Sequence, residues 1–349
     1  MSTTPPTSLI PEWVEQSAVV LAWPYSGGDF SRWLDAVEAT YAHIAIEVAR
    51  RERLIVICRD TAHQRHIETR LTQDGAALER VRFVCQPYND VWVRDSAPLS
   101  VLGRAGVHLL NFRFNGWGGK YECVDDSLLA ERLHASGALG GSALEPVDFV
   151  LEGGSVEADG RGVIMTTRRC LLNPNRNPDW DKSQIEACLR ERLGAEKVLW
   201  LEHGHAEGDD TDAHIDTLAR FCSEDTIAYT ACDQAEDPLY PEFQRMEEQL
   251  KTFTSLQGQP YRLVALPMPA PIRDEEGHRL PATYANFLII NGAVLVPVYR
   301  DPADVVALER LAACFPDRMI VPVDCVPLIH QYGSLHCMTM QFPAEIHVN

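Results

Sequence analysis

The 349-residue sequence lacks the motifs that mark several large protein classes. None of its ten cysteines forms a Cys-x-x-Cys pair, which excludes zinc-ribbon and thioredoxin motifs. No Gly-x-Gly-x-x-Gly or Walker-type loop follows a strand-like run, so the usual nucleotide-binding loops are not expected. There is no run of about 18 apolar residues, and the N-terminus has neither the basic nor the apolar region of a signal peptide. We therefore expect a cytoplasmic protein with reduced thiols.

Basic residues are also scarce. The 31 Lys and Arg residues are outnumbered by 50 Asp and Glu residues, which gives a formal net charge of −19. Nucleic acids and anionic membranes favour the opposite sign, so neither is an expected partner. The negative charge suits a cationic small-molecule substrate, although a solvated acidic surface is the simpler explanation of the charge alone.

Strand-like apolar runs alternate with amphipathic helical stretches along the whole chain. Strands are predicted at residues 17–23, 53–58, 81–85, 91–101 and 106–114, with short apolar runs at 198–201, 262–266 and 319–323. Helices are predicted at residues 30–50, 61–73, 126–136, 181–193, 238–255 and 302–315. The order strand, helix, strand, strand recurs about five times, which favours an α/β repeat fold. No linker divides the sequence, so we expect one domain over residues 1–349.

Two segments place a carboxylate beside strand-like or glycine-rich sequence. Charged and apolar residues alternate over residues 89–98, which predicts a strand end whose polar face meets a cavity. There Asp95 can grip a guanidinium through two parallel hydrogen bonds, unless it forms only a surface pair with Arg94. Glu152 follows an apolar run and precedes two glycines, which let a ligand approach the backbone closely. A turn with an exposed glutamate is the alternative.

A third segment, residues 207–216, combines several acids with a histidine. His214 and Asp216 lie two positions apart, and in a strand both side chains would point to the same face. A carboxylate beside an imidazole orients the ring and favours its protonated form, which suits a proton shuttle. An acidic turn is the plain alternative. The rival functional interpretation is a zinc or manganese site made of His203, His205, Asp210, His214 and Asp216.

The fourth segment, residues 331–340, contains Cys337 after a glycine-containing turn. A thiol becomes a nucleophile when an imidazolium, a substrate cation or backbone donors lower its pKa. The neighbouring His336 is not the expected partner, because adjacent residues of an extended chain point to opposite faces. Another buried structural cysteine is the alternative. Upstream, residues 115–120 predict a glycine-rich lid that carries Trp117.

The order of these segments resembles the agmatine deiminase and bacterial peptidyl-arginine deiminase family of the guanidine-modifying superfamily. The motifs that carry the resemblance are Trp-x-Arg-Asp, Leu-Glu-Gly-Gly, His-x-Asp and a C-terminal His-Cys. Residues 112–120 and 172–178 also look like that family, and the resemblance extends from about Trp13 to Pro343. It implies the pentein fold, a five-bladed α/β propeller with pseudo-fivefold repeats and the site on its axis.

The resemblance also implies a role for each candidate catalytic residue. Cys337 matches the nucleophile, and His214 matches the general acid/base. Asp95 and Asp216 match the carboxylates that grip the guanidinium. Glu152 matches a third carboxylate, which we expect to hold His214 or the substrate.

Three further residues are expected to contact the substrate. Trp92 matches an aromatic residue that packs on the substrate's aliphatic stem, and Trp117 and Asp210 are additional candidate contacts. Agmatine is the substrate that the resemblance implies. The acidic composition also favours agmatine, because this molecule has a second cation and no carboxylate. Its hydrolysis to N-carbamoylputrescine and ammonia would proceed through a covalent thiouronium on the cysteine. No metal or organic cofactor is expected.

Other functions within and outside this family stay open. Free arginine needs a cation for its carboxylate, which Arg94, Arg113 or Arg176 could supply. Peptidyl-arginine deimination, amidino transfer and non-catalytic guanidine binding are further alternatives. Two departures from the common family sequence leave the far end of the substrate undefined, namely Ala213 in place of glycine and residues 332–335 in place of a glycine-rich run. A homodimer is expected only as the commonest assembly.

Overall fold

The chain forms several small sheets rather than one large sheet. The computed structural model describes residues 7–205 and 208–348. Within these residues the strands form five sheets. With strands given in spatial order, one four-stranded sheet comprises β1 (Ser8–Leu9), β5 (Leu99–Gly103), β6 (Gly106–Arg113) and β7 (Leu144–Val150), and the other comprises β17 (Thr339–Pro343), β2 (Gln16–Ala22), β3 (Arg53–Cys58) and β4 (Val81–Cys85). Two three-stranded sheets comprise β10 (Lys197–Leu201), β9 (Val163–Thr167) and β8 (Val156–Ala158), and β11 (Ala219–Ser223), β12 (Thr226–Ala231) and β13 (Arg262–Pro267). The remaining three-stranded sheet comprises β14 (Leu288–Ile290), β15 (Ala293–Val298) and β16 (Met319–Asp324).

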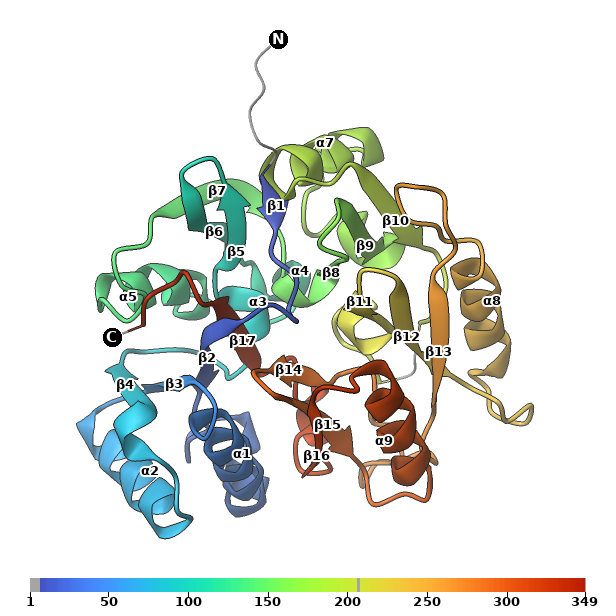
Figure 1. Ribbon diagram of the computed structural model, residues 1–349. Coiled ribbons are helices and arrows are strands. Elements are labelled where there is room, and N and C mark those ends of the chain that lie inside the picture. The colour runs from blue at the N-terminus through green and yellow to red at the C-terminus, as the bar shows by residue number, and fades with distance from the viewer. Residues whose placement is uncertain (1–6, 206–207, 349) are drawn as a thin grey trace.

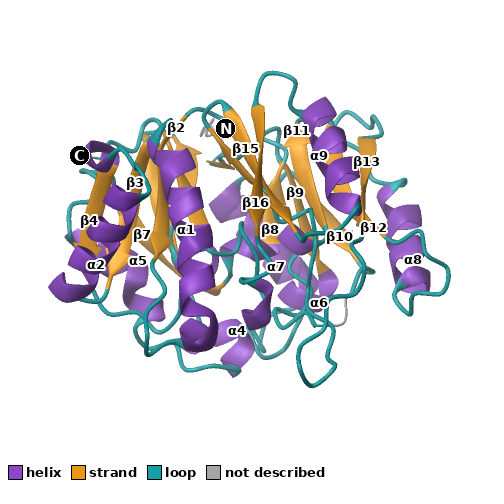
Figure 2. Ribbon diagram, turned by 90° about the horizontal axis from the view of Figure 1, so that it is seen from below, coloured by secondary structure: helices purple, strands orange, loops and turns teal. Residues whose placement is uncertain are grey.

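Every sheet contains the same pairing pattern. An antiparallel pair is followed by a strand that pairs in parallel with the second member, as in β5–β6–β7 and β14–β15–β16. A parallel partner requires a crossover connection, which is usually a helix. The crossover helices are α1 (Leu34–Ala49), α5 (Leu129–Ala135), α7 (Lys182–Leu193), α8 (Tyr240–Leu250) and α9 (Ala303–Cys314). The sheets lie around a common centre with these longer helices on the outside (Figure 1), and the view from below shows the same mixed α/β arrangement (Figure 2).

The remaining helical elements are short, apart from α2. They include α2 (Thr61–Gln73), α3 (Val93–Ser96), α4 (Gly116–Gly119) and α6 (Arg168–Leu171). The 3-10 turns are η1 (Asp29–Trp33), η2 (Leu78–Arg80), η3 (Asp126–Leu128), η4 (Gly153–Ser155), η5 (Ile215–Thr217) and η6 (Ile329–Gln331). In this described part of the chain, no helix is both long and apolar enough to cross a bilayer. The ten cysteines are all unpaired, as predicted.

Most predicted elements are confirmed, and the main error concerns residues 91–101. The predicted helix at 61–73 coincides with α2, and the strands at 53–58 and 81–85 coincide with β3 and β4. Residues 91–101 were predicted as one strand, but α3 occupies their centre and β5 begins only at Leu99. All four residues of α3 are buried. The alternation of charged and apolar residues therefore does not separate a solvent face from a core face, because both kinds of side chain have interior partners.

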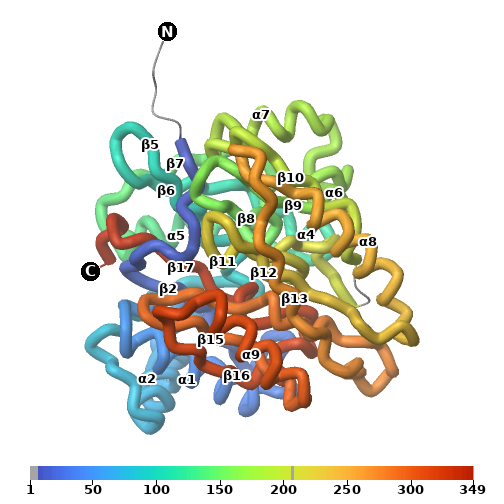
Figure 3. The backbone as a smooth tube through the Cα atoms, turned by 45° about the vertical axis from the view of Figure 1, so that its right-hand side comes forward, coloured from blue at the N-terminus to red at the C-terminus, as the bar shows by residue number. Residues whose placement is uncertain are grey.

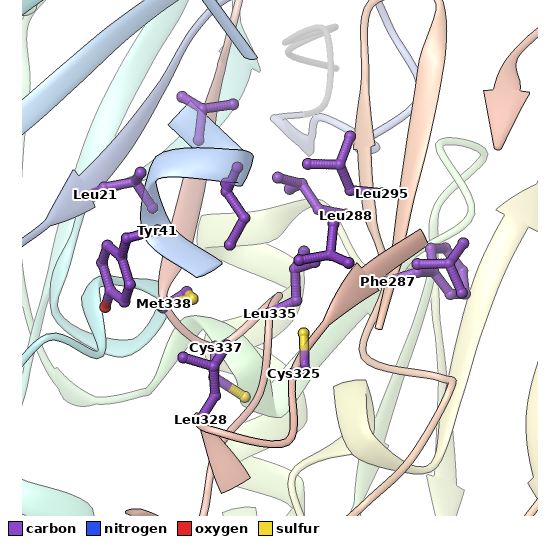
Figure 4. Close-up of a cluster of buried hydrophobic side chains, with 14 of the residues drawn as sticks. Leu21, Tyr41, Phe287, Leu288, Leu295, Cys325, Leu328, Leu335, Cys337 and Met338 are labelled. Atoms are coloured by element: carbon purple, nitrogen blue, oxygen red, sulfur yellow. The ribbon is translucent and has the colours of Figure 1, made fainter. Parts of the chain in front are cut away.

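The two ends of the chain meet in one sheet. β17 pairs antiparallel with β2, with Thr339 opposite Leu21 and Phe342 opposite Ala18. The two strands lie side by side in the ribbon, one near the blue end and the other near the red end of the colour scale (Figure 1). Cys337 immediately precedes β17 and borders a buried apolar cluster that includes Leu328, Leu335 and Met338 (Figure 4). The candidate nucleophile therefore lies between a buried apolar cluster and a strand that pairs the two ends of the chain.

The core beside the site gives a test of this packing. Phe287 is fully buried, and its ring packs against Phe315 at 5.8 Å between ring centres. We expect Phe287→Ala to lower the free energy of unfolding by about 3–5 kcal/mol, because it removes a buried aromatic ring and leaves a cavity. Leu102→Ala is the control, since Leu102 is 49% exposed, and should change that free energy by at most about 0.5 kcal/mol. Urea unfolding measures both, and equal effects would contradict the packing described.

Candidate active site

Side chains from separate segments converge on one cleft. The cleft encloses about 480 Å³ of empty space, partly open to solvent. Cys337 and Asp95 line it, whereas His214, Asp216 and Glu152 are buried next to them. The other lining residues are Asp29, Asp90, Trp92, Trp117, Tyr121, Asp210, Thr211, Gln331, Tyr332 and Gly333. Every residue that the sequence assigned to the site therefore lies in or directly behind this cleft.

The Cys337 thiol is buried and is held by an amide. Its Sγ lies 3.3 Å from Nδ2 of Asn286 and 3.7 Å from Oδ2 of Asp216. Burial and the nearby charges of Asp216 and Asp95 raise the pKa of the Cys337 thiol well above its ordinary value. At neutral pH the residue is therefore a thiol until a positive charge enters the cleft.

The two oxygens of Asp216 have different environments. Oδ2 accepts a hydrogen bond from Nδ1 of His336 at 2.7 Å and another from Nδ2 of Asn286 at 3.3 Å. Oδ1 is buried and has no hydrogen-bond partner among the described residues. Burial opposes ionisation, but the hydrogen bond and charge of His336 outweigh it and lower the pKa of Asp216. Asp216 is therefore a carboxylate with one oxygen available as an acceptor.

Asp95 is oriented by two glycine-containing segments. Its Oδ1 accepts a hydrogen bond from the Gly154 amide at 3.0 Å, and its Oδ2 accepts one from Nε1 of Trp117 at 2.9 Å. Nδ1 of His214 lies 3.6 Å from the same Oδ1. Burial raises the pKa of Asp95, against the opposing charge of His214. The indole of Trp117, in the segment predicted as a lid, thus contacts this carboxylate directly.

His214 is surrounded by groups that favour its protonated form. Burial alone would lower the pKa of His214, but Asp95, Cys170 and Glu152 outweigh it and raise that pKa to about 10. The ring is therefore an imidazolium at neutral pH. A Cβ atom at Gly154 would lie only 2.7 Å from Nδ1 of His214, so glycine is needed to leave space beside the ring.

Glu152 anchors the segment that carries His214. Nε of Arg176 lies 2.8 Å and 3.0 Å from the two carboxylate oxygens of Glu152. The same guanidinium donates to Oδ2 of Asp212 at 2.8 Å and to the carbonyl oxygen of Thr211 at 2.9 Å. The carboxylate thus acts on His214 both through its charge and through this bridge to the preceding residues.

The backbone before His214 is unusual. Asp212 and Ala213 both have φ of +65°, a region that costs a non-glycine residue of order 1 kcal/mol. Glycine adopts this conformation readily, which is a physical reason for the glycine that the family resembled by this sequence commonly has at the position of Ala213. Residues 214–216 do not form a strand, because Asp216 lies in the 3-10 turn η5 and His214 precedes it. The turn, rather than strand alternation, brings the two side chains together.

Acidic and aromatic residues form the outer part of the cleft. Asp29, Asp90 and Asp210 lie there with Trp92 and Tyr332, and none of the described lining residues is basic. Burial raises the pKa of Asp90 to about 6. Because several acidic residues line the cleft and no basic residue is among the described lining residues, the cleft has a field that favours a cationic ligand.

The rival metal site is not assembled. The group of possible ligands that does come together among the described residues is Glu152, Cys170 and His214. His203 lies instead 3.5 Å from Glu242, and Asp210 accepts a hydrogen bond from Tyr121 and contacts Lys120. Glu207, within the predicted segment, lies outside the described residues. In the observed trio Glu152 already binds the Arg176 guanidinium, which opposes a metal cation.

Sequence reasoning missed several residues that shape the site. Asn286 contacts both the thiol and Asp216, yet it is a single amide ahead of an apolar run with no motif around it. Glu12 and Arg220 lie behind His336 and are distant from it in sequence. A lone charged residue in an apolar strand, such as Arg220 in β11, was the available signal, because a buried charge requires a partner.

Comparisons with known proteins agree with this geometry. The family model of the Porphyromonas-type peptidyl-arginine deiminases matches residues 8–343. Agmatine deiminase of Ectopseudomonas mendocina is 31% identical over 95% of this chain and 94% of its own length.

Two solved structures are similar over almost their whole length. The "Putative Arginine Deiminase" of Porphyromonas gingivalis is 44% identical with a TM-score of 0.90, and the match covers 97% of this chain and 98% of that one. A Cys-to-Ser variant of C. jejuni agmatine deiminase with substrate bound is 35% identical with a TM-score of 0.89, and the match covers 96% of each chain.

The protonation state of the thiol can be tested by alkylation. We expect iodoacetamide to modify Cys337 slowly at pH 7 and faster as the pH rises. Asp216→Asn should accelerate the reaction, by roughly 10-fold for each unit by which the thiol pKa falls, because it removes a negative charge 3.7 Å from the sulfur. Peptide mass mapping measures the rates, and the exposed Cys85 is the internal control. Unchanged or slower modification of Cys337 in the variant would contradict this electrostatic description.

Proposed function

Because the chain belongs to the Porphyromonas-type peptidyl-arginine deiminase family, we propose that it acts as an agmatine deiminase with Cys337 as nucleophile. The reaction hydrolyses the guanidinium of agmatine to N-carbamoylputrescine and ammonia. The observation that carries the choice of substrate is an acidic, aromatic cleft that ends at a thiol, a carboxylate and an imidazolium.

The cleft favours agmatine over free arginine. The three arginines considered as carboxylate partners are all engaged elsewhere. Arg176 binds Glu152 and Asp212, Arg113 pairs with Asp148 at the surface, and Arg94 lies behind the site against Met340. The carboxylate of arginine would therefore meet Asp29, Asp90 and Asp210 rather than a cation. The second cation of agmatine is attracted by the same groups.

In the first half-reaction the guanidinium lies between Asp95 and Asp216. The available Oδ1 of Asp216 and the carboxylate of Asp95 accept its N–H groups and fix its plane. The added positive charge lowers the thiol pKa, and the proton of Cys337 leaves to solvent. The thiolate forms a bond to the central carbon, and His214 protonates one nitrogen, which departs as ammonia. A cationic thiouronium and a neutral imidazole remain.

In the second half-reaction water replaces the sulfur. Neutral His214 accepts a proton from water, and the oxygen bonds to the thiouronium carbon. The carbon–sulfur bond breaks, and the proton on the new oxygen passes to the thiolate, which becomes a thiol again. The ureido product leaves with the starting protonation of the site restored. No group beyond these side chains takes part in the proposed steps.

The remaining site residues have supporting roles in this proposal. Trp92 and Trp117 enclose the aliphatic stem, and Asp210 lies near the distal amine. Glu152 holds His214 through its charge and through Arg176. Gly333 permits this arrangement, because a Cβ atom there would lie 2.5 Å from the Trp92 ring.

The same proposal extends to the architecture. We infer that the five sheets are the blades of a pentein propeller with pseudo-fivefold repeats and that residues 1–349 act as one catalytic domain. The repeated antiparallel and parallel pairing in each sheet supports this inference. A homodimer stays a prediction.

The function is tested by measuring ureido product from agmatine, free arginine and a peptidyl-arginine. We expect kcat/KM for agmatine to exceed that for arginine by at least about 100-fold, because the carboxylate has no partner in the cleft. Cys337→Ser should lose more than about 1,000-fold of the activity. Cys85→Ser, which changes an exposed thiol, should retain it. Equal activity of wild type and Cys337→Ser would exclude the proposed nucleophile, and preference for arginine would exclude the proposed substrate.

The pH dependence of binding follows from Asp90. Burial raises the pKa of Asp90 to about 6, so this carboxyl is neutral below that value and ionised above it. We expect the KM for agmatine to fall as the pH rises through about 6, because the ionised form attracts the substrate. Asp90→Asn should remove this change and raise KM at pH 7.5. Asp148→Asn is the control, since Asp148 is exposed and pairs with Arg113. A KM profile unaltered by Asp90→Asn would refute the assignment.

A further inference from the structure

Two cysteines outside the cleft have their sulfur atoms in contact. Sγ of Cys58 lies 3.4 Å from Sγ of Cys85. Cys58 is the last residue of β3 and is fully buried, whereas Cys85 is the last residue of β4 and is exposed. All ten cysteines belong to the described residues, and Cys85 is the exposed one among them. The proposed mechanism uses neither of these two thiols.

The backbone around this pair fits a disulfide. β3 and β4 are parallel, and Cys58 lies directly opposite Cys85 in their register. Neighbouring strands lie about 4.8 Å apart, and the Cα atoms of a disulfide lie about 4.4–6.8 Å apart, so neither strand has to move. The carbonyl oxygen of Cys58 also accepts a hydrogen bond from the Gln86 amide at 2.9 Å, which holds the strand ends together. Rotation of the two side chains is therefore enough to join the sulfurs.

Cys85 is open to solvent because β4 is an edge strand. The strand order in its sheet is β17, β2, β3 and β4. Helix α2 packs against β3 and β4, and it lies beside α1 on the outside of the molecule (Figure 3). Sγ of Cys85 lies 3.5 Å from Oε1 of Gln64, an α2 residue. A small dissolved molecule can thus reach this sulfur without entering the core.

The two thiols differ in reactivity. Burial, together with the hydrogen bond and charge of Cys85, raises the pKa of the Cys58 thiol. A buried thiol with a raised pKa rarely attacks a dissolved reagent, whereas an exposed thiol is accessible for that step. Once the Cys85 sulfur carries a leaving group, Cys58 is the thiol in contact with it. The pair therefore combines an outer attacking thiol with an inner resolving thiol.

We propose that Cys58 and Cys85 form a reversible redox site whose oxidant is a low-molecular-weight disulfide. In the first step the Cys85 thiolate bonds to one sulfur of that molecule, and its other sulfur leaves as a thiolate. In the second step the Cys58 sulfur bonds to the Cys85 sulfur, and the remaining thiolate leaves and accepts the Cys58 proton. Two protein thiols are oxidised to one disulfide, while the small disulfide is reduced to two thiols.

The resolving thiol determines the outcome of oxidation at this edge. A single exposed cysteine would keep the small molecule as an adduct or be open to further, irreversible oxidation. Cys58 displaces the adduct and leaves an internal disulfide. Exposed disulfides are more easily reduced than buried structural ones, so thiols in the surroundings restore the pair. This site lies apart from the cleft residues, and its chemistry does not depend on the proposed function.

The test is peptide mapping of the folded protein after treatment with oxidised glutathione. Remaining thiols are blocked with iodoacetamide, and the digest is analysed by mass spectrometry without reduction. We expect the peptides of Cys58 and Cys85 to be crosslinked at least about 10-fold more than any other pair, because sulfurs in contact react as an intramolecular pair. Reduced glutathione should restore both thiols. The same treatment in concentrated urea should abolish the preference.

Cys58→Ser is the matched control, since it keeps the exposed thiol and removes the resolving one. In this variant Cys85 should retain glutathione as a stable adduct, and Cys85→Ser should give neither the adduct nor the crosslink. A stable adduct on Cys85 of the wild type, two free thiols, or an equal preference in urea would each overturn the proposal. If Cys58→Ser does not fold, the wild-type comparisons decide alone. None of these measurements requires turnover of agmatine.

Discussion

The structure depends on the pairing of carboxylates that are kept away from water. An ionised carboxylate loses several kcal/mol of hydration on burial unless charges and hydrogen bonds replace it. Each buried acid of the site meets this requirement with a partner from another part of the chain: Asp216 with His336, Glu152 with Arg176, and Asp95 with the Trp117 indole and the Gly154 amide. These pairs connect strands, turns and loops that the backbone hydrogen bonds of the sheets do not join. The geometry of the candidate site therefore depends on one electrostatic constraint.

The same constraint explains how the cleft can select a cation. The charges behind the site are balanced, but those around the opening are not, because acidic residues line it without a basic one among the described residues. A positive ligand completes this half of the charge pattern and, in the proposed mechanism, also favours the Cys337 thiolate. In that proposal reactivity is coupled to the arrival of the correct charge. The acidic composition alone indicated only a solvated surface. In this cleft the acidic side chains have a specific effect, because together they attract a cation.

Short motifs were enough to select the residues that the structure brings together in the candidate site, since Cys337, His214, Asp95, Asp216 and Glu152 each stand in a distinctive local sequence. Local geometry was less predictable. Residues 91–101 alternate like a strand but contain a helical turn, because their polar side chains have buried partners. Asn286, Glu12 and Arg220 were not foreseen, since each acts through contacts with residues far away in the sequence. Such contacts depend on how the sheets assemble. A single sequence without a motif around these positions carries little information about that assembly.

The pairing of β2 with β17 has a consequence for biosynthesis. The ribosome delivers β2 early, but its antiparallel partner emerges about 320 residues later, which takes roughly 15–60 seconds at ordinary elongation rates. During that interval one edge of a strand that is apolar after Gln16 and Ser17 has no partner and is open to other chains. Cys337 emerges just ahead of β17, so the proposed nucleophile and the closing strand arrive together. Nascent chains of this protein should consequently depend on chaperones until the last strand is made, and the candidate site can be complete only at that point.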